Sequence, residues 1–165
     1  MGSFEGVLDT RSAWIGKYEV VNVIFDPSKV SYDALLEAAM KKGCASRAWT
    51  TTEAQAKVAA KRLESRATAL TEKLRDAKES DQLYYLSRAA MNYLPLTPLQ
   101  ARRVNGAMYL RTNPEKWLSP RQLAQLKRVE AKLNKEATAL KGFVRPTEIG
   151  ELAAYSAKLD KAIAN

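Results

Sequence analysis

Residues 6–44, GVLDTRSAWIGKYEVVNVIFDPSKVSYDALLEAAMKKGC, decide the fold of this chain. Two runs within them, 7–14 and 18–25, are rich in β-branched and aromatic residues, which is typical of strands. Gly16 lies between the runs and supplies the positive φ that a tight turn requires. Pro27 ends the second run, because proline cannot donate to a strand ladder. The sequence therefore predicts an antiparallel hairpin.

An amphipathic helix is expected after the hairpin. Ser31 is a suitable N-cap for a helix over residues 32–42, and Gly43 is a suitable residue for its C-terminal end. One face of this helix is apolar and consists of Leu35, Leu36, Ala39 and Met40. Residues 45–50 then return as a short strand. This β-β-α-β order is most of a ferredoxin-like sandwich without its first strand and first helix, so we predict an α+β protein with a partial ferredoxin-like unit over residues 1–50.

From Thr52 onward the hydrophobic period is helical. An Ala-rich seam with alternating spacings of four and three predicts a helix of roughly seven turns. Its members are Ala56, Ala60, Leu63, Ala67, Leu70, Leu74 and Ala77. Thr97-Pro98 and Ser119-Pro120 are each followed by a glutamine in the position of a capping box, and they predict the starts of two further helices. A last helix is expected from Thr147. We therefore expect residues 51–165 to form a basic, mostly helical region packed on the first unit.

The composition excludes several classes of site. Histidine is absent and Cys44 is the single cysteine, which excludes Ser-His and Cys-His nucleophile pairs, ordinary His-containing zinc sites and an internal disulfide. We predict no metal and no cofactor. No apolar run approaches the roughly 20 residues of a membrane span, and no targeting signal is recognisable in these residues. The compartment therefore stays open, including the case of a signal encoded upstream.

Charge is distributed unevenly. Residues 1–50 contain as many acidic as basic residues, so the formal net charge of +9 belongs to residues 51–165. Such asymmetry is typical of proteins with an anionic partner, and nucleic acid is one such partner. The candidate phosphate-binding residues are Arg102, Arg103, Arg121, Lys127 and Arg128, with Tyr84 or Tyr85 stacking on bases. The alternative is a solvated helical surface with core tyrosines, because acidic residues interrupt the basic runs.

Part of the first quarter of the chain resembles a known family. The run GVLDTRSAWIG at residues 6–16, followed by EVVNVIFDPS at 19–28 and VSYDALLE at 30–37, is similar to the core of peptide methionine sulfoxide reductase A. Heavy-metal-associated domains share a similar rhythm and the ferredoxin-like order. Both families carry their active cysteines upstream of this core, and only residues 1–5 precede it here. The resemblance therefore implies a degenerate relative, or a chain whose catalytic segment is not in this sequence.

Few residues of the reductase site have a counterpart in this chain. Of that site only Glu19 aligns, Tyr18 stands where the family has histidine, and the family's long insertion is reduced to residues 15–17. Cys44 is the only other candidate, and it follows a helix C-terminus, which is the negative end of the helix dipole. Glu19 and Cys44 are thus weak catalytic candidates.

Three tryptophans complete the candidate set. Trp14, Trp49 and Trp117 either line a ligand groove or seal core edges. We expect a protein without reductase activity in this form that acts as an interaction or redox-support module, with a protein partner. The alternative is a nucleic-acid-binding module that uses the basic C-terminal helices.

Overall fold

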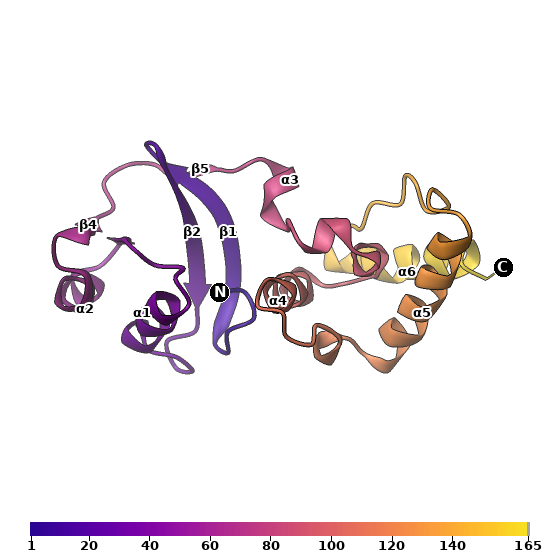
Figure 1. Ribbon diagram of the computed structural model, residues 1–165, viewed down its shortest axis with the longest axis horizontal. Coiled ribbons are helices and arrows are strands. Elements are labelled where there is room, and N and C mark those ends of the chain that lie inside the picture. The colour runs from indigo at the N-terminus through magenta and orange to yellow at the C-terminus, as the bar shows by residue number, and fades with distance from the viewer. Residues whose placement is uncertain (165) are drawn as a thin grey trace. The chain divides into compact units, whose positions relative to one another are not determined.

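The computed structural model describes residues 1–164, apart from the side chains of residues 79 and 80 (Figure 1). It is an α+β structure in two compact units, Ser3–Lys78 with Met1, and Glu79–Asn165 with Gly2. The change of hydrophobic period predicts a boundary at residue 50, whereas the compact units divide after Lys78. The residues between these two positions belong to the first unit because they add strands and a helix to it.

A three-stranded antiparallel sheet forms the centre of the first unit. Strands β1 (Val7–Ile15) and β2 (Tyr18–Phe25) form the predicted hairpin, and Gly16 adopts a φ of +53° in its turn. Strand β5 (Arg75–Asp76) pairs with the opposite side of β1, so the strand order is β2-β1-β5. β2 therefore lies at the edge of this sheet.

Helix α1 (Tyr32–Lys41) follows as predicted. The Ser31 hydroxyl accepts a hydrogen bond from the Ala34 N–H at 3.2 Å and caps the helix. At the other end Gly43 has a φ of +67°, its N–H donates to the Met40 carbonyl, and the Cys44 N–H donates to the Ala39 carbonyl. This pair of hydrogen bonds is a Schellman motif, in which Cys44 is the second residue beyond the cap.

The helix predicted from Thr52 to Ala77 is wrong in its second half. Helix α2 (Glu53–Leu63) ends where Glu64 adopts a φ of +52°, and a 3₁₀ turn η1 (Glu64–Arg66) leads into strand β4 (Ala67–Ala69). β4 pairs in parallel with β3 (Ala48–Thr50). Alanine at helical spacing buries little area on any face, so the pattern does not discriminate between a helix and a short strand that gains backbone hydrogen bonds.

The expected return strand forms in a different sheet. β3 lies within the predicted residues 45–50 but pairs with β4, and the β3-β4 pair is separate from the β2-β1-β5 sheet. Residues 1–164 therefore form two small sheets, and the continuous ferredoxin-like sheet is not among them.

Helices α1 and α2 lie side by side on the same side of the hairpin (Figure 1). Leu36, Ala59 and Leu63 form a small buried cluster between them. At the surface the Arg62 guanidinium makes a two-pronged ion pair with Asp33, and this contact holds the pKa of the Asp33 carboxyl below its usual range. Apolar packing and one ion pair thus fix α2 on α1.

The second unit is built from helices joined by short 3₁₀ turns. The helices are α3 (Glu79–Gln82), α4 (Pro98–Tyr109), α5 (Pro120–Lys135) and α6 (Leu152–Ala162), and the turns are η2 (Leu86–Arg88), η3 (Ala90–Tyr93), η4 (Glu115–Trp117) and η5 (Ile149–Glu151). The starts predicted for α4 and α5 are confirmed. The last helix begins at Leu152, five residues after the expected Thr147, because a 3₁₀ turn precedes it. Among residues 1–164, no helix has both the length and the apolar composition that crossing a membrane requires.

Two capping boxes connect α4 to α5. Gln100 accepts from the Thr97 N–H at 3.1 Å, and Gln122 accepts from the Ser119 N–H at 2.8 Å. The two glutamine side chains also donate to one another, at 3.0 and 3.2 Å. Each side chain therefore caps its own helix and holds the cap of the other.

A polar network joins α5 to α6. The fully buried Gln125 donates through Nε2 to Ser156 and to Asp160, at 2.9 and 3.0 Å. Asp160 also accepts from Arg121 and Arg128, at 3.0 and 2.7 Å. These contacts, with the Gln125 hydrogen bond as the largest contribution, hold the pKa of Asp160 below its usual range.

Candidate functional site

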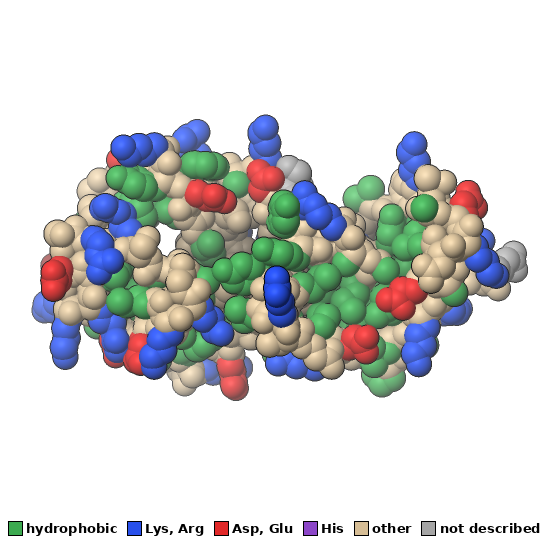
Figure 2. All heavy atoms as spheres, viewed as in Figure 1, with side chains coloured by type: hydrophobic (Ala, Val, Ile, Leu, Met, Phe, Trp, Pro, Cys, Tyr) green, Lys and Arg blue, Asp and Glu red, His purple; other side chains and the backbone are tan. Residues whose placement is uncertain are grey.

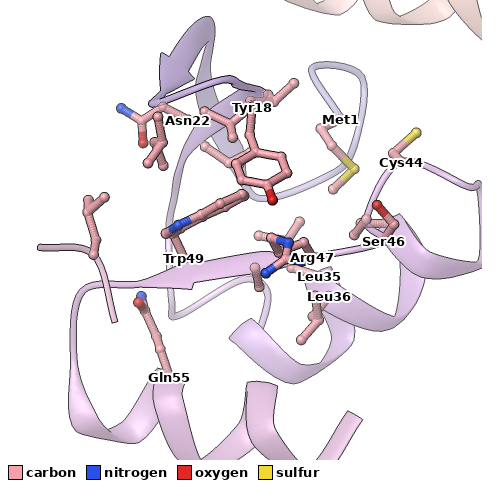
Figure 3. Close-up of a pocket in the computed structure, with 18 of the residues that line it drawn as sticks. Met1, Tyr18, Asn22, Leu35, Leu36, Cys44, Ser46, Arg47, Trp49 and Gln55 are labelled. Carbon is pink, nitrogen blue, oxygen red and sulfur yellow. The ribbon is translucent and has the colours of Figure 1, made fainter. Parts of the chain in front are cut away.

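A cavity of about 670 Å³ opens on the first unit, bordered by β2, α1 and the segment around β3 (Figure 3). Its lining includes residues 18–23, which follow one another along β2, and residues 44–49, of which Ala48 and Trp49 belong to β3. Side chains that share one face of a strand occur at every second residue. Consecutive lining residues therefore indicate that the strand edges, with their backbone groups, border the cavity. We call this cavity the groove.

The β1–β2 register identifies the backbone groups that β2 presents at its free edge. Val21 lies opposite Ser12, and the Ser12 carbonyl accepts from the Ala77 N–H on the β5 side at 2.9 Å. Because hydrogen-bonded and non-hydrogen-bonded pairs alternate along an antiparallel ladder, Val21 and Val23 direct their N–H and C=O groups away from β1. Within the described part of the chain, no strand pairs with this edge of β2.

The wall that α1 contributes to the groove is apolar. Leu35, Leu36 and Ala39 line it, and each is less than 9% exposed. Tyr32 lies at the start of the same helix, 6.4 Å from the Phe25 ring between centroids, and partial burial raises the pKa of its hydroxyl. The groove thus combines a hydrophobic wall with two polar backbone edges.

An arginine lies across two aromatic rings in the groove. The rings of Tyr18 on β2 and Trp49 on β3 have centroids 5.5 Å apart. The Arg47 guanidinium carbon lies 5.1 Å from the Tyr18 ring and 5.8 Å from the Trp49 ring, so both rings make cation–π contacts with it. Figure 3 shows these three side chains together between the strands. Among the described residues no carboxylate lies within ion-pair distance of Arg47.

The two catalytic candidates, Glu19 and Cys44, both line the groove. Cys44 carries an exposed thiol whose sulfur lies 3.5 Å from the Lys42 carbonyl oxygen. In Figure 3 its side chain lies beside Met1, at the other end of the groove from Trp49, and the sulfur points away from the rings. Glu19 is exposed on β2. The thiol thus lies apart from the aromatic residues of the groove.

The basic candidates of the second unit are largely occupied by structural contacts. Arg121 and Arg128 pair with Asp160, and the Arg103 guanidinium lies 4.9 Å from the Trp117 ring. Arg102 lies on α4 and is half-buried, while Lys127 is exposed on α5. On the face in Figure 2, Lys and Arg side chains are spread over the surface with Asp and Glu between them. No continuous basic band is seen on that face.

The three tryptophans have different surroundings. Trp49 lines the groove, Trp117 packs against the core of the second unit, and Trp14 on β1 is 37% exposed. Trp49 therefore lies at a cavity and Trp117 at the edge of a core, while ligand binding at Trp49 stays a prediction.

Sequence reasoning missed Arg47, and noted Tyr18 only as a departure from the reductase pattern. A signal for Arg47 exists in the sequence, because Arg47 and Trp49 are two residues apart in a predicted strand and therefore share a face. The contact with Tyr18 has no such signal, since it joins residues that only the fold brings together.

Among the described residues, no three histidine, cysteine, aspartate or glutamate side chains are grouped so that they could hold a metal ion. Comparison of the chain with protein-family models, with curated proteins and with solved structures finds no match.

Proposed function

We propose that this protein is a non-catalytic interaction module, related to methionine sulfoxide reductase A, whose groove binds an extended segment of a partner protein. The segment adds as a strand to the free edge of β2. The observation that carries this proposal is that two strand edges border one cavity. Unpaired edges pair readily with another chain, and main-chain hydrogen bonds then supply affinity.

The proposal also accounts for the separation of β3 from the hairpin. In a ferredoxin-like sandwich the two strands of a split β-α-β unit lie on either side of a third strand. We propose that β2, α1 and β3 form such a unit, and that the partner segment takes the position between its strands. The hydrophobic wall of α1 would then be covered by side chains of the added strand.

We propose an absence of reductase chemistry because the only thiol follows the end of α1 and lies apart from the aromatic residues of the groove. Cys44 occupies a fixed position in the Schellman motif of α1, and its sulfur points away from Tyr18 and Trp49. We expect no turnover of a methionine-sulfoxide peptide with dithiothreitol as reductant. Turnover that disappears in Cys44→Ser would contradict this part of the proposal.

A tethered strand tests binding even though the natural partner is unidentified. Met1 lines the groove, so an extended, β-branched segment of about seven residues can be fused upstream of it through about six Gly and Ser residues, which gives an effective concentration in the millimolar range. We expect the fusion to slow hydrogen exchange at the Val21 and Val23 amides. A fusion of the same length with proline at alternate positions is the matched control, because proline cannot donate to a ladder.

A pair of variants on β2 locates the binding edge. Val21 and Ile24 are 53% and 52% exposed, and only Val21 lines the groove. We expect Val21→Lys to abolish the protection given by the tethered strand and Ile24→Lys to leave it intact. Equal behaviour of the two variants, or no protection with any fusion, would overturn the proposal. Protection without a fusion, together with a dimeric mass, would assign the groove to a second copy of this chain and would also overturn it.

A further inference from the structure

We infer that the groove selects a partner segment with an acidic side chain, whose carboxylate binds Arg47. This inference rests on the proposed function and adds the chemistry of the segment. It depends on three features of the groove: the cation–π contacts of Arg47, its lack of an acidic partner among the described residues, and the charge of the lining.

Two aromatic rings lie close to the Arg47 guanidinium. Contacts of 5.1 and 5.8 Å to the rings of Tyr18 and Trp49 restrict the side chain from two strands. A cation–π contact does not use the N–H groups of a guanidinium as hydrogen-bond donors, so these groups can still donate to a carboxylate. Arg47 is therefore arranged as a donor before a partner arrives, so less conformational freedom is lost on binding.

The available donors of Arg47 have no acceptor within the described part of the chain. By contrast, Arg62 in the same unit donates to Asp33 and Glu37, and Arg11 pairs with Asp76. Arg47 thus differs from neighbouring arginines in that its contacts are with rings alone. An arginine in this state is typical of a site that binds an external carboxylate or phosphate.

The charge of the lining favours an acidic ligand. Arg47 and Arg66 supply two positive side chains, and among the side chains that the structure describes Glu19 is the only acidic one that lines the groove. Arg66 donates through Nε to the Leu63 carbonyl at 3.3 Å, whereas the contacts of the Arg47 guanidinium are with the two rings. The strand edges themselves require an extended polypeptide. An acidic side chain on an extended segment therefore satisfies both requirements, whereas a free phosphate satisfies only the first.

The test uses the tethered strands with one position changed at a time. A single glutamate is placed in turn at each position of the β-branched segment, and each fusion is compared with its glutamine and lysine counterparts. We expect one glutamate position to raise the protection of the Val21 amide by about tenfold over glutamine, because a charge-assisted hydrogen bond is about twice as strong as a neutral one. Lysine at that position is expected to lower the protection below that of glutamine.

Variants of the chain assign the effect to Arg47. Arg47→Gln should remove the difference between glutamate and glutamine, and Arg47→Lys should retain part of it, because lysine keeps the charge but not the planar fork. Lys57→Gln is the matched control, since Lys57 is exposed on α2, does not line the groove and removes the same charge. Equal protection with all fusions would overturn this inference and leave strand addition in place, whereas no protection with any fusion would overturn the proposed function.

Discussion

Hydrogen exchange along β2 should alternate from one residue to the next. The perturbation is transfer of the unbound protein into D₂O. Val20 and Asn22 lie opposite Ala13 and Arg11 in the register, so the alternation of the ladder directs their amides toward β1. The amides of Val21 and Val23 face the groove. We therefore expect slow exchange at the first two amides and fast exchange at the other two.

The size of the difference follows from the ladder. Exposure of the Val20 amide requires loss of the two hydrogen bonds of its pair with Ala13, at a net stabilisation of about 1 kcal/mol each. A free-energy difference of about 2 kcal/mol corresponds to a rate about thirtyfold slower than that of an amide that needs no opening. Exchange through opening of the whole hairpin would make the contrast larger, because more bonds then break together.

The measurement is residue-by-residue amide exchange by NMR, with each rate divided by the rate expected for an unstructured chain. The Ile24→Lys variant serves as a control, because it adds a charge to β2 without changing the pairing of Val20 to Val23. Similar protection of all four amides would refute the reasoning, since it would mean that the outer edge of β2 is already paired or covered. The groove would then not be open to a partner strand.

Three further predictions concern the rest of the chain. In denaturant unfolding, Gly43→Ala should lower the free energy of unfolding by about 1 kcal/mol, because Gly43 has a φ of +67° and nothing lies within 4 Å of an added Cβ. Gly6→Ala should cost about 1–3 kcal/mol more, because its Cβ would lie 2.6 Å from a methyl carbon of Val30. Equal losses in the two variants would contradict this steric explanation. The lowered pKa of Asp160 predicts a contribution to stability that is fully present above about pH 4 and is lost as the pH falls through the pKa of the folded state. Unfolding measured at a series of pH values should show this loss in the wild type and not in Asp160→Asn. The same pH dependence in both proteins would contradict the prediction. In a titration with mixed-sequence single-stranded DNA at two salt concentrations, we expect weak binding with a shallow salt dependence; tight binding that falls steeply with salt would instead support the nucleic-acid alternative.

Much of the local structure is predictable from the sequence, because local residues specify it. The Gly16 turn, the Ser31 cap and the Gly43 end each depend on the conformation of one residue and on neighbours within a few positions. The same holds for the two capping boxes. The strand β4 is not predictable in this way, since it has three residues, a helical Ala pattern and a partner strand 19 positions away at Ala48–Ala67.

The candidate site is predictable in part. Trp49, Glu19 and Cys44 are candidates on sequence grounds, and all three line the groove. The function expected of them depends on individual side chains, whereas the groove depends mainly on backbone edges. Edges cannot be located from sequence alone, because a strand is at an edge only by virtue of the strands that do not pair with it.

The mutual hydrogen bonds of Gln100 and Gln122 bear on how this protein can change during evolution. Loss of either glutamine removes a cap from its own helix and a partner from the other side chain, so the second glutamine retains less of its benefit once the first is gone. Lineages that replace one of them are therefore expected to replace both. Among homologous chains the two positions should covary, even though 22 residues separate them along the sequence.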